Sequence, residues 1–291
     1  MTLRRLRHVA LKAPSRGIRV PLYDSSLGLV DTAQRGALRP FTTITAFSAA
    51  SHATAFAFWE FPGFLPGQKD AQIHLSRPDT MAIPRRRGVA GHVGQFVDDE
   101  VVCVDAVLVT SRPRTWLDNA RKMSVEELTV VADHLLRVPR PAFETRGEAQ
   151  CTLEELAEML DRHKGTPGIR KARLALEHSR VGADSAPETR LRLALEFAGL
   201  PEPQLNVPTD LGSGVVRQPD LGYPDQRVAV EYDGDVHSTP EQVVRDIARE
   251  EDFHRAGWLL VRISKRHMGS AARAAVSKVR SALLSRGWSP D

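Results

Sequence analysis

The segment Val228–Asp233, with the sequence VAVEYD, alternates apolar and polar side chains in a way that predicts a half-buried β-strand. Its two valines and its tyrosine would lie on one face of the strand, and Glu231 and Asp233 on the other. Side chains two positions apart share a face and lie about 6.6 Å apart along the strand. Two carboxylates therefore project side by side from a strand whose opposite face is apolar.

A third acid, Asp220, precedes this strand by a short spacer. The residues Tyr223–Gln226 suit a type I turn with proline at its second position. Pairing of the two ends of that turn would place Asp220 opposite Ala229, on the same face as Glu231 and Asp233. Asp220 and Glu231 would then be diagonal neighbours, about 7–8 Å apart. A register slip of one residue would move Asp220 to the other face of the sheet.

Three acids on one face predict a bound cation. Without one, the carboxylates would repel one another and would be costly to remove from water. Ligands that offer only oxygen favour a hard ion, Mg²⁺ with Mn²⁺ as an alternative, over zinc. Taken one at a time, these acids also fit a structural interpretation, because Asp220 and Asp225 suit turns and Asp233-Gly234 is a common turn pair.

The length of 291 residues suggests two domains. The segment Val138–Glu148 holds two prolines and a glycine and interrupts the helical pattern. We therefore expect an N-terminal α+β domain over residues 1–140, a connector of two helices over 141–184, and a C-terminal domain over 185–291. The predicted fold class is mixed α/β, of the α+β kind.

The C-terminal domain has the clearer pattern, with elements in the order α-β-β-β-α-β-α. The predicted helices are Glu188–Ala198, Thr239–Ala256 and Ala271–Ser285, and the predicted strands are Gln204–Val207, Val215–Leu221, Arg227–Tyr232 and Trp258–Ile263.

The N-terminal half and the connector read less clearly. The predicted strands are Gly17–Leu22, Ala71–Leu75, Gly88–Phe96 and one or two strands within Glu100–Thr110, and the predicted helices are Thr45–Trp59, Ser111–Ala120, Ser124–Arg137, Thr152–His163 and Ile169–Ser179.

Composition narrows the setting of the protein. The two cysteines, Cys103 and Cys151, form no CxxC pair, which favours a reducing compartment. The basic start is not followed by a continuous apolar run, so we expect no secretory signal, and the most apolar stretch, Ile44–Phe61, is too mixed to span a bilayer. We expect a cytoplasmic protein without a membrane partner. A net charge of +4 permits a polyanionic partner but does not require one.

Asp220, the spacer and Glu231-Tyr232-Asp233 resemble the PD-(D/E)XK nuclease motif. Together with the segments ETRLRLALEFAGLP, RD and GWLLVRI, they resemble the Vsr-like branch of that superfamily, over about Ser185–Ser264. The resemblance implies a restriction-endonuclease-like αβββαβ core with a mixed sheet. It also implies a Mg²⁺-dependent endonuclease that hydrolyses phosphodiester bonds in DNA.

The resemblance implies roles for the acids. Asp220 and Glu231 match the metal-binding acids, and Glu188 matches the acid of the first helix. Asp233 stands where the family usually has a lysine, so it would be a further metal ligand or would activate water. Glu188 equally suits the structural role of an acid in the first turn of a helix.

Three further residues next to the motif are candidates for catalysis and DNA binding. His237 would act as general base or steady the attacked phosphate, or is a structural histidine near a helix start. Arg245 and Arg249, four apart on one helix face, would bind phosphate oxygens, or form a solvated face.

The N-terminal half carries no catalytic spacing. Its segments FTTITAFSAASHATAFAFWEFPG and LVTSRPRTWLDNARKMSVEELTVVADHLLR resemble the C-terminal part of AbiEi-type antitoxins, over about Phe41–Arg137. This half would bind substrate or a protein partner. Its basic run, Arg85, Arg86 and Arg87, would hold a nucleic-acid backbone or form a solvated loop. The alternative to a nuclease is a non-catalytic DNA-binding regulator, or an antitoxin-like protein, that retains a nuclease fold.

Overall fold

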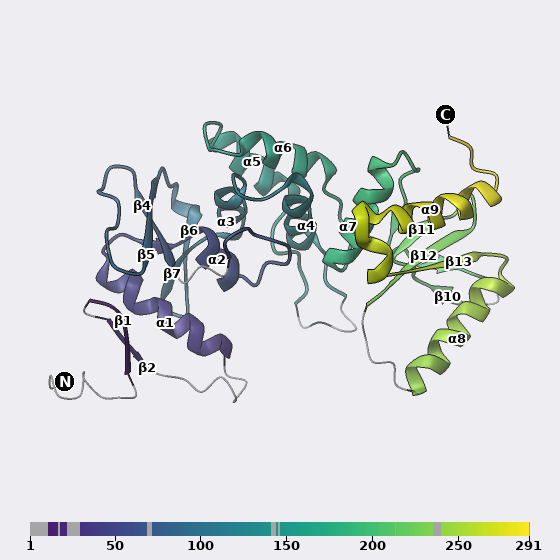
Figure 1. The fold of residues 1–291 in the computed structure, drawn as a ribbon, viewed down its shortest axis with the longest axis horizontal. Coiled ribbons are helices and arrows are strands. Elements are labelled where there is room, and N and C mark those ends of the chain that lie inside the picture. Colours follow the sequence, from purple (N-terminus) through teal and green to yellow (C-terminus); the bar gives the residue numbers. More distant parts are fainter. Residues whose placement is uncertain are drawn as a thin grey trace. The chain divides into compact units, whose positions relative to one another are not determined.

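The computed structural model describes residues 11–16, 18–21, 30–68, 72–140, 144, 146–212, 214–234 and 240–290 (Figure 1). The chain divides into two compact units. Unit 1 comprises Met1–Leu128 and Leu153–Leu174, and unit 2 comprises Thr129–Thr152 and Ala175–Asp291. The chain passes between the units inside α4 (Val125–Leu136), again between Thr152 and Leu153, and inside α6 (Ile169–His178), whereas the sequence suggested a boundary within Val138–Glu148.

Unit 1 is built on a five-stranded mixed sheet with the strand order β5-β4-β3-β7-β6. These strands are β3 (Ala49–Ala50), β4 (Ile73–Pro78), β5 (Val89–Gly94), β6 (Val101–Val104) and β7 (Val107–Thr110). The central strand β3 is antiparallel to β4 and parallel to β7. The hairpin of β6 and β7 turns at Asp105 and Ala106, whose φ angles of 51° and 61° are those of a two-residue type I′ turn.

The remaining elements of unit 1 are a small hairpin and several helices. They are β1 (Leu11–Ser15), β2 (Ile18–Pro21), α1 (Val30–Ile44), α2 (His52–Phe58), the 3₁₀ turn η3 (Asp98–Glu100), α3 (Arg112–Asn119) and α5 (Leu153–Arg162).

One predicted helix of unit 1, Thr45–Trp59, is wrong in its first half. The chain forms strand β3 there, and only α2 is helical. Phe47 and His52, on either side of this strand, take positive φ angles of 54° and 49°. A right-handed helix cannot continue through such residues. A short run of small apolar residues suits a buried strand as well as a helix, and here pairing with β4 and β7 decides.

Unit 2 is built on a four-stranded mixed sheet with the strand order β13-β12-β11-β8. β11 is antiparallel to both β8 and β12, and β12 is parallel to β13. The elements follow the predicted α-β-β-β-α-β-α order, except that the predicted strand Val215–Leu221 divides into two and a short strand that was not predicted, β9, pairs with the first of these. In chain order they are α7 (Ala186–Phe197), β8 (Gln204–Leu205), β9 (Thr209–Asp210), β10 (Val216–Arg217), β11 (Leu221–Tyr223), β12 (Val228–Asp233), α8 (Pro240–Arg255), β13 (Leu259–Ser264), the 3₁₀ turn η4 (Lys265–Met268) and α9 (Gly269–Ser285).

The apolar face of this sheet forms the core of unit 2. Val228 and Val230 of β12 are fully buried with Ile263 of β13, and they pack against α7 and α9. Figure 1 shows α9 and α8 on opposite sides of the sheet. The predicted alternation in β12 therefore holds: its valines face the core, and its acids lie on the face that α8 covers.

The hairpin between β11 and β12 is longer than the sequence suggested. Tyr223 pairs with Val228, and the loop between them has four residues. The backbone N–H of Arg227 donates to the carbonyl of Pro224, so proline opens the turn and does not occupy its second position. Arg227 takes a positive φ of 49° to complete the loop. The predicted register is wrong by two residues, and an even shift leaves every side chain on its predicted face.

A buried ion pair joins α4 to α7 within unit 2. The side chains of Asp133 and Arg192 are 1% and 2% exposed, and their atoms Oδ2 and Nη2 lie 2.8 Å apart. Asp133 also accepts hydrogen bonds from the hydroxyl of Thr189 and from the backbone N–H of Arg180. One carboxylate thus holds α4, the end of α6 and α7 together.

No helix of the described residues is long and apolar enough to cross a membrane.

Replacing Asp133 with alanine should lower the free energy of unfolding by about 3–5 kcal/mol, because it leaves Arg192 charged and buried without its partner. The matched control is Glu196→Ala, which removes the half-exposed second partner of Arg192 and should cost at most about 1 kcal/mol. Denaturant unfolding followed by circular dichroism measures both. Equal effects of the two substitutions would contradict the assigned role of Asp133.

Candidate functional site

A pocket of about 510 Å³ opens on the acid-bearing face of the unit 2 sheet. It lies between the carboxyl end of β12 and the middle of α8. The residues that line it are Arg217, Asp220, Glu231, Tyr232, Asp233, Arg245, Asp246, Ala248 and Arg249. The structure therefore brings together the three acids and the two arginines of α8 that the sequence singled out.

The hairpin register places Asp220 and Glu231 directly across from each other. Leu221 pairs with Val230, and continuing this register by one residue sets Asp220 opposite Glu231. Residues in such positions have Cβ atoms about 4.5–5.5 Å apart, closer than the diagonal arrangement expected from the sequence. Asp233 lies two residues further along the same face.

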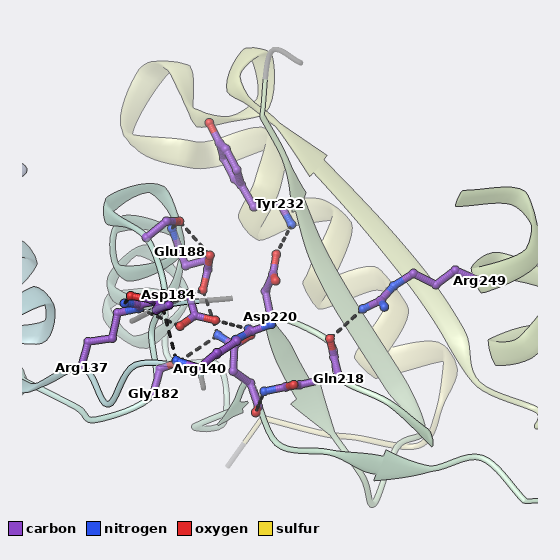
Figure 2. Close-up of polar contacts among 12 residues, drawn as sticks. Arg137, Arg140, Gly182, Asp184, Glu188, Gln218, Asp220, Tyr232 and Arg249 are labelled. Carbon is purple, nitrogen blue, oxygen red and sulfur yellow. Dashed lines mark hydrogen bonds and ion pairs between the residues drawn. The ribbon is translucent and has the colours of Figure 1, made fainter. Parts of the chain in front are cut away.

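Asp220 sits in an unfavourable place for a charged group. Its Oδ2 accepts a 2.7 Å hydrogen bond from the backbone N–H of Tyr232, as Figure 2 shows. Burial, together with the nearby negative charges of Glu188 and Glu231, raises the pKa of Asp220 to about 7. The Tyr232 hydrogen bond and the Arg249 charge oppose this shift without cancelling it. Asp220 is therefore a carboxyl group that gains from any additional positive charge nearby.

The other two acids of the pocket face arginines. Glu231, whose side chain is 12% exposed, forms an ion pair with Nε of Arg249. Nη2 of Arg249 also donates to the carbonyl of Gln218 at 2.6 Å, so the guanidinium is fixed at two points (Figure 2). Asp233 is half exposed, and its Oδ2 lies 3.7 Å from Nη1 of Arg262. Each acid thus keeps part of its coordinating capacity facing the pocket.

Glu188 holds the first turn of α7. Ser185 is the N-cap and donates its hydroxyl to Glu188 Oε1, while Glu188 Oε2 accepts from the backbone of Asp184 and from Nδ2 of Asn206. Ser185 Oγ also accepts from the backbone N–H of Glu188, so the two residues form a variant of the capping box in which the carboxylate accepts from the residue before the N-cap. Both carboxylate oxygens have structural partners, and Glu188 acts on Asp220 through its charge rather than by lining the pocket.

The remaining predicted site residues are divided between the units. Arg245 and Arg249 line the pocket from α8. His237 lies outside the described residues. The basic run Arg85–Arg87 belongs to unit 1, in the loop between β4 and β5, where Arg86 donates to the carbonyl of Arg16.

Two arginines at the site were not predicted. Arg217 lines the pocket and pairs with Asp252 of α8. Arg262 lies beside Glu231 in the parallel pairing of β12 and β13, on the acid-bearing face. The sequence LLVRIS of β13 could have identified Arg262 as a site residue. It is the one charged side chain of an otherwise apolar strand, and it pairs with Glu231 of β12. Arg217 carried no such signal, because its place depends on the short β9–β10 hairpin.

The donor set of the pocket fits a hard divalent ion. Asp220 and Glu231 offer carboxylate oxygens at neighbouring strands. The pKa of Asp220 is raised by burial and nearby negative charge, and a bound cation would stabilise its ionised form. Within the described ranges, no group of three or more His, Cys, Asp and Glu residues is already arranged around one point. A bound ion would therefore take two protein carboxylates and complete its shell with water, as Mg²⁺ usually does.

The raised pKa of Asp220 predicts that this residue destabilises the metal-free protein at neutral pH. Its contribution to stability falls as pH rises from the ordinary value near 3.8 to about 7, because the folded state holds the proton longer than the unfolded chain. Asp220→Asn keeps the acceptor for Tyr232 and removes the charge. In EDTA, its stability relative to wild type should increase by about 2–3 kcal/mol between pH 5 and pH 8, since the pKa lies about two units above pH 5 and one pKa unit is about 1.4 kcal/mol.

Denaturant unfolding at the two pH values measures this difference, and Glu188→Gln serves as a second variant. Glutamine can still complete the capping box, while loss of the Glu188 charge should lower the pKa of Asp220 and weaken the pH dependence. A difference between Asp220→Asn and wild type that does not change with pH would contradict the description of Asp220.

Comparison with known proteins finds two curated relatives, both from Mycobacterium tuberculosis. The chain is 29% identical over 192 residues to "Uncharacterized protein MT2308" of strain CDC 1551 / Oshkosh, and equally to "Uncharacterized protein Rv2248" of strain ATCC 25618 / H37Rv. Each match covers 66% of this chain and 66% of the relative. No family model matches the chain, and no solved structure matches it.

Proposed function

We propose that unit 2 is a metal-dependent endonuclease that hydrolyses phosphodiester bonds in DNA. The observation that carries the proposal is that Asp220, just before β11, and Glu231 of the adjacent strand β12 line one pocket together with arginines of α8. Carboxylates that share one face need a cation, and arginines around them favour a phosphate-bearing substrate. The two requirements are met together by phosphodiester hydrolysis.

The residues of the pocket would have separate roles in this reaction. Asp220 and Glu231 would hold Mg²⁺ or Mn²⁺ between the strands. Such an ion, when bound, polarises a phosphate oxygen and lowers the pKa of a bound water. Arg245 would bind phosphate oxygens at the mouth of the pocket, and Arg249 orients Glu231 through its ion pair.

Asp233 is the acid best placed to accept a proton from the attacking water. It is half exposed, and among the described residues its recorded basic partner is Arg262 at 3.7 Å, too far for a hydrogen bond that would occupy its oxygen. Asp220 and Glu231 are each held by a direct hydrogen bond or ion pair, which suits ligands. His237 would follow the same strand and remains a second candidate for this role.

The order of elements around the pocket supports the nuclease proposal. A helix, an antiparallel set of three strands, a helix and a parallel fourth strand are what resemblance to the PD-(D/E)XK superfamily implies. The acids lie at the ends of the second and third strands of that set, β11 and β12.

The proposal places the protein in the reducing cytoplasm. Cys103 and Cys151 are free thiols, in keeping with such a compartment.

Asp220→Asn and Glu231→Gln should each lower the rate of DNA cleavage at least about 100-fold, because each removes a metal-binding charge with little change in volume. The assay incubates the full chain with supercoiled, linear and single-stranded DNA in Mg²⁺, Mn²⁺ or EDTA. The matched control is Asp225→Asn, the same substitution at an exposed residue in the turn of the same hairpin. It should cleave as wild type does.

The same assay addresses the alternative function. A non-catalytic regulator would bind a particular DNA sequence and give no product with any ion. Sequence-specific binding by the full chain, with no cleavage of any DNA form in either metal, would replace the nuclease proposal by the regulator. A variant at Asp220 or Glu231 that cuts as well as wild type would remove that residue from the metal site.

Affinity for the metal should depend on pH in the direction set by Asp220. A proton competes with the ion for this carboxylate, whose pKa is about 7. Mn²⁺ binding to the full chain should therefore be weaker at pH 6 than at pH 8 by about tenfold, since the ionised fraction falls about tenfold per unit below the pKa. Isothermal titration calorimetry measures the affinity, and equal affinity at the two values would exclude Asp220 as a ligand.

A further inference from the structure

A second pocket, of about 650 Å³, lies entirely within unit 1. It is lined by the end of β5, the first residue of α2, the second half of α3 with the residues after it, and the loop that follows α5. Its volume falls in the range of sites for small-molecule ligands. The nuclease proposal uses none of its residues.

The lining of this pocket carries unpaired positive charge. Among its cations, Arg114 and Arg162 form ion pairs with acids of unit 1. Arg121, Lys122 and Lys164 are exposed and make no ion pair within the described part of the chain. Three unpaired cations around one cavity favour a ligand with several negative charges.

The one acid that lines the pocket, Asp118, has an oxygen without a partner. Its side chain is 5% exposed, and Oδ1 accepts from Nε of Arg114 at 2.8 Å. Oδ2 is buried and has no hydrogen-bond partner among the residues that the structure describes, and its nearest recorded polar neighbour, Nδ1 of His52, is 4.0 Å away. Buried carboxylate oxygens are nearly always hydrogen-bonded, so this one indicates a missing donor.

Two imidazole rings form an uncharged part of the wall. His52 and His92 stack with their ring centroids 3.7 Å apart, and His92 is hydrogen-bonded to His74 at 2.9 Å. Burial is the main cause that lowers the pKa of both His52 and His92 to about 3, and neighbouring histidines and Lys122 add to the shift. Both rings are neutral at physiological pH, so the positive charge of the pocket comes from the arginines and lysines of its lining.

The pocket therefore offers three kinds of contact at once: unpaired cations, one unpartnered acceptor, and a neutral aromatic wall. Inorganic phosphate would use only the first. A sugar hydroxyl or a base amino group supplies the donor that Asp118 Oδ2 lacks, and a sugar or base can lie against uncharged rings.

We propose that this pocket binds a free nucleoside polyphosphate, with its phosphates against Arg121, Lys122 and Lys164 and a hydroxyl or amino group donating to Asp118. Arg114 positions the acid through its hydrogen bond to Oδ1. The site is separate from the pocket of unit 2 and does not depend on the function proposed there.

Calorimetric titration of the full chain tests the proposal, in low salt with EDTA so that no divalent ion is bound elsewhere. The probes are the four common ribonucleoside triphosphates, adenosine, pyrophosphate and a single-stranded DNA oligonucleotide with a 5′-phosphate. At least one triphosphate should bind, and adenosine and pyrophosphate should each bind at least tenfold more weakly. Arg121→Ala and Lys122→Ala should each weaken triphosphate binding at least fivefold.

The matched control is Arg170→Ala, at an exposed arginine of unit 1 that does not line the pocket, and it should leave binding unchanged. Asp118→Asn should weaken triphosphate binding but not pyrophosphate binding, a pattern that unfolding would not produce. Absence of triphosphate binding, or binding that Arg121→Ala and Lys122→Ala leave unchanged, would overturn the proposal. Tighter binding of the oligonucleotide, lost in both variants, would overturn it in favour of a nucleic-acid site.

Discussion

The arrangement of unit 2 depends on the carboxylate of Asp133. A buried acid with an arginine and two further donors is stable only when all its partners are in place, and these partners come from α7 and from the end of α6. This contact fixes the direction of α7 and involves no residue that lines the pocket. Because α7 also packs on the apolar face of the sheet, the same helix is held by an ion pair on one side and by Leu191 and Leu195 on another.

The position of α7 has an electrostatic consequence for the pocket. Its capping acid, Glu188, is tied to Asn206, and the backbone N–H of Asn206 donates to the carbonyl of Asp220. A group that stabilises a helix start therefore lies close enough to raise the pKa of Asp220, although its oxygens have other partners. Glu188 therefore takes the structural role that the sequence left open for it, and in addition its charge raises the pKa of Asp220.

Local patterns predicted most of the elements and the faces of the strands, because alternation in β12 and capping signals before α4, α5 and α8 are properties of neighbouring residues. Two kinds of feature were missed. The hairpin register depended on a four-residue loop that Arg227 closes with a positive φ, which the residue types did not indicate. The assignment of α4 depended on a contact between residues far apart in the sequence. The sequence assigned α4 to the N-terminal domain, yet Asp133 joins this helix to α7 within unit 2, and a boundary at residue 140 would cut this acid away from Arg192.

The two pockets retain unfavourable electrostatics of different kinds. In unit 2, burial and the charges of Glu188 and Glu231 raise the pKa of Asp220. In unit 1, three cations have no acid partner among the described residues, and Asp118 keeps a buried oxygen for which these residues supply no donor. The fold itself gains nothing from either arrangement, since an apolar or paired substitute at each position would be more stable. A molecule of complementary charge would remove each cost at neutral pH: a cation beside Asp220, and a polyanion that also carries a donor beside Asp118. These local violations of the rules that govern the rest of the chain are therefore the strongest physical reason to assign ligands to both units.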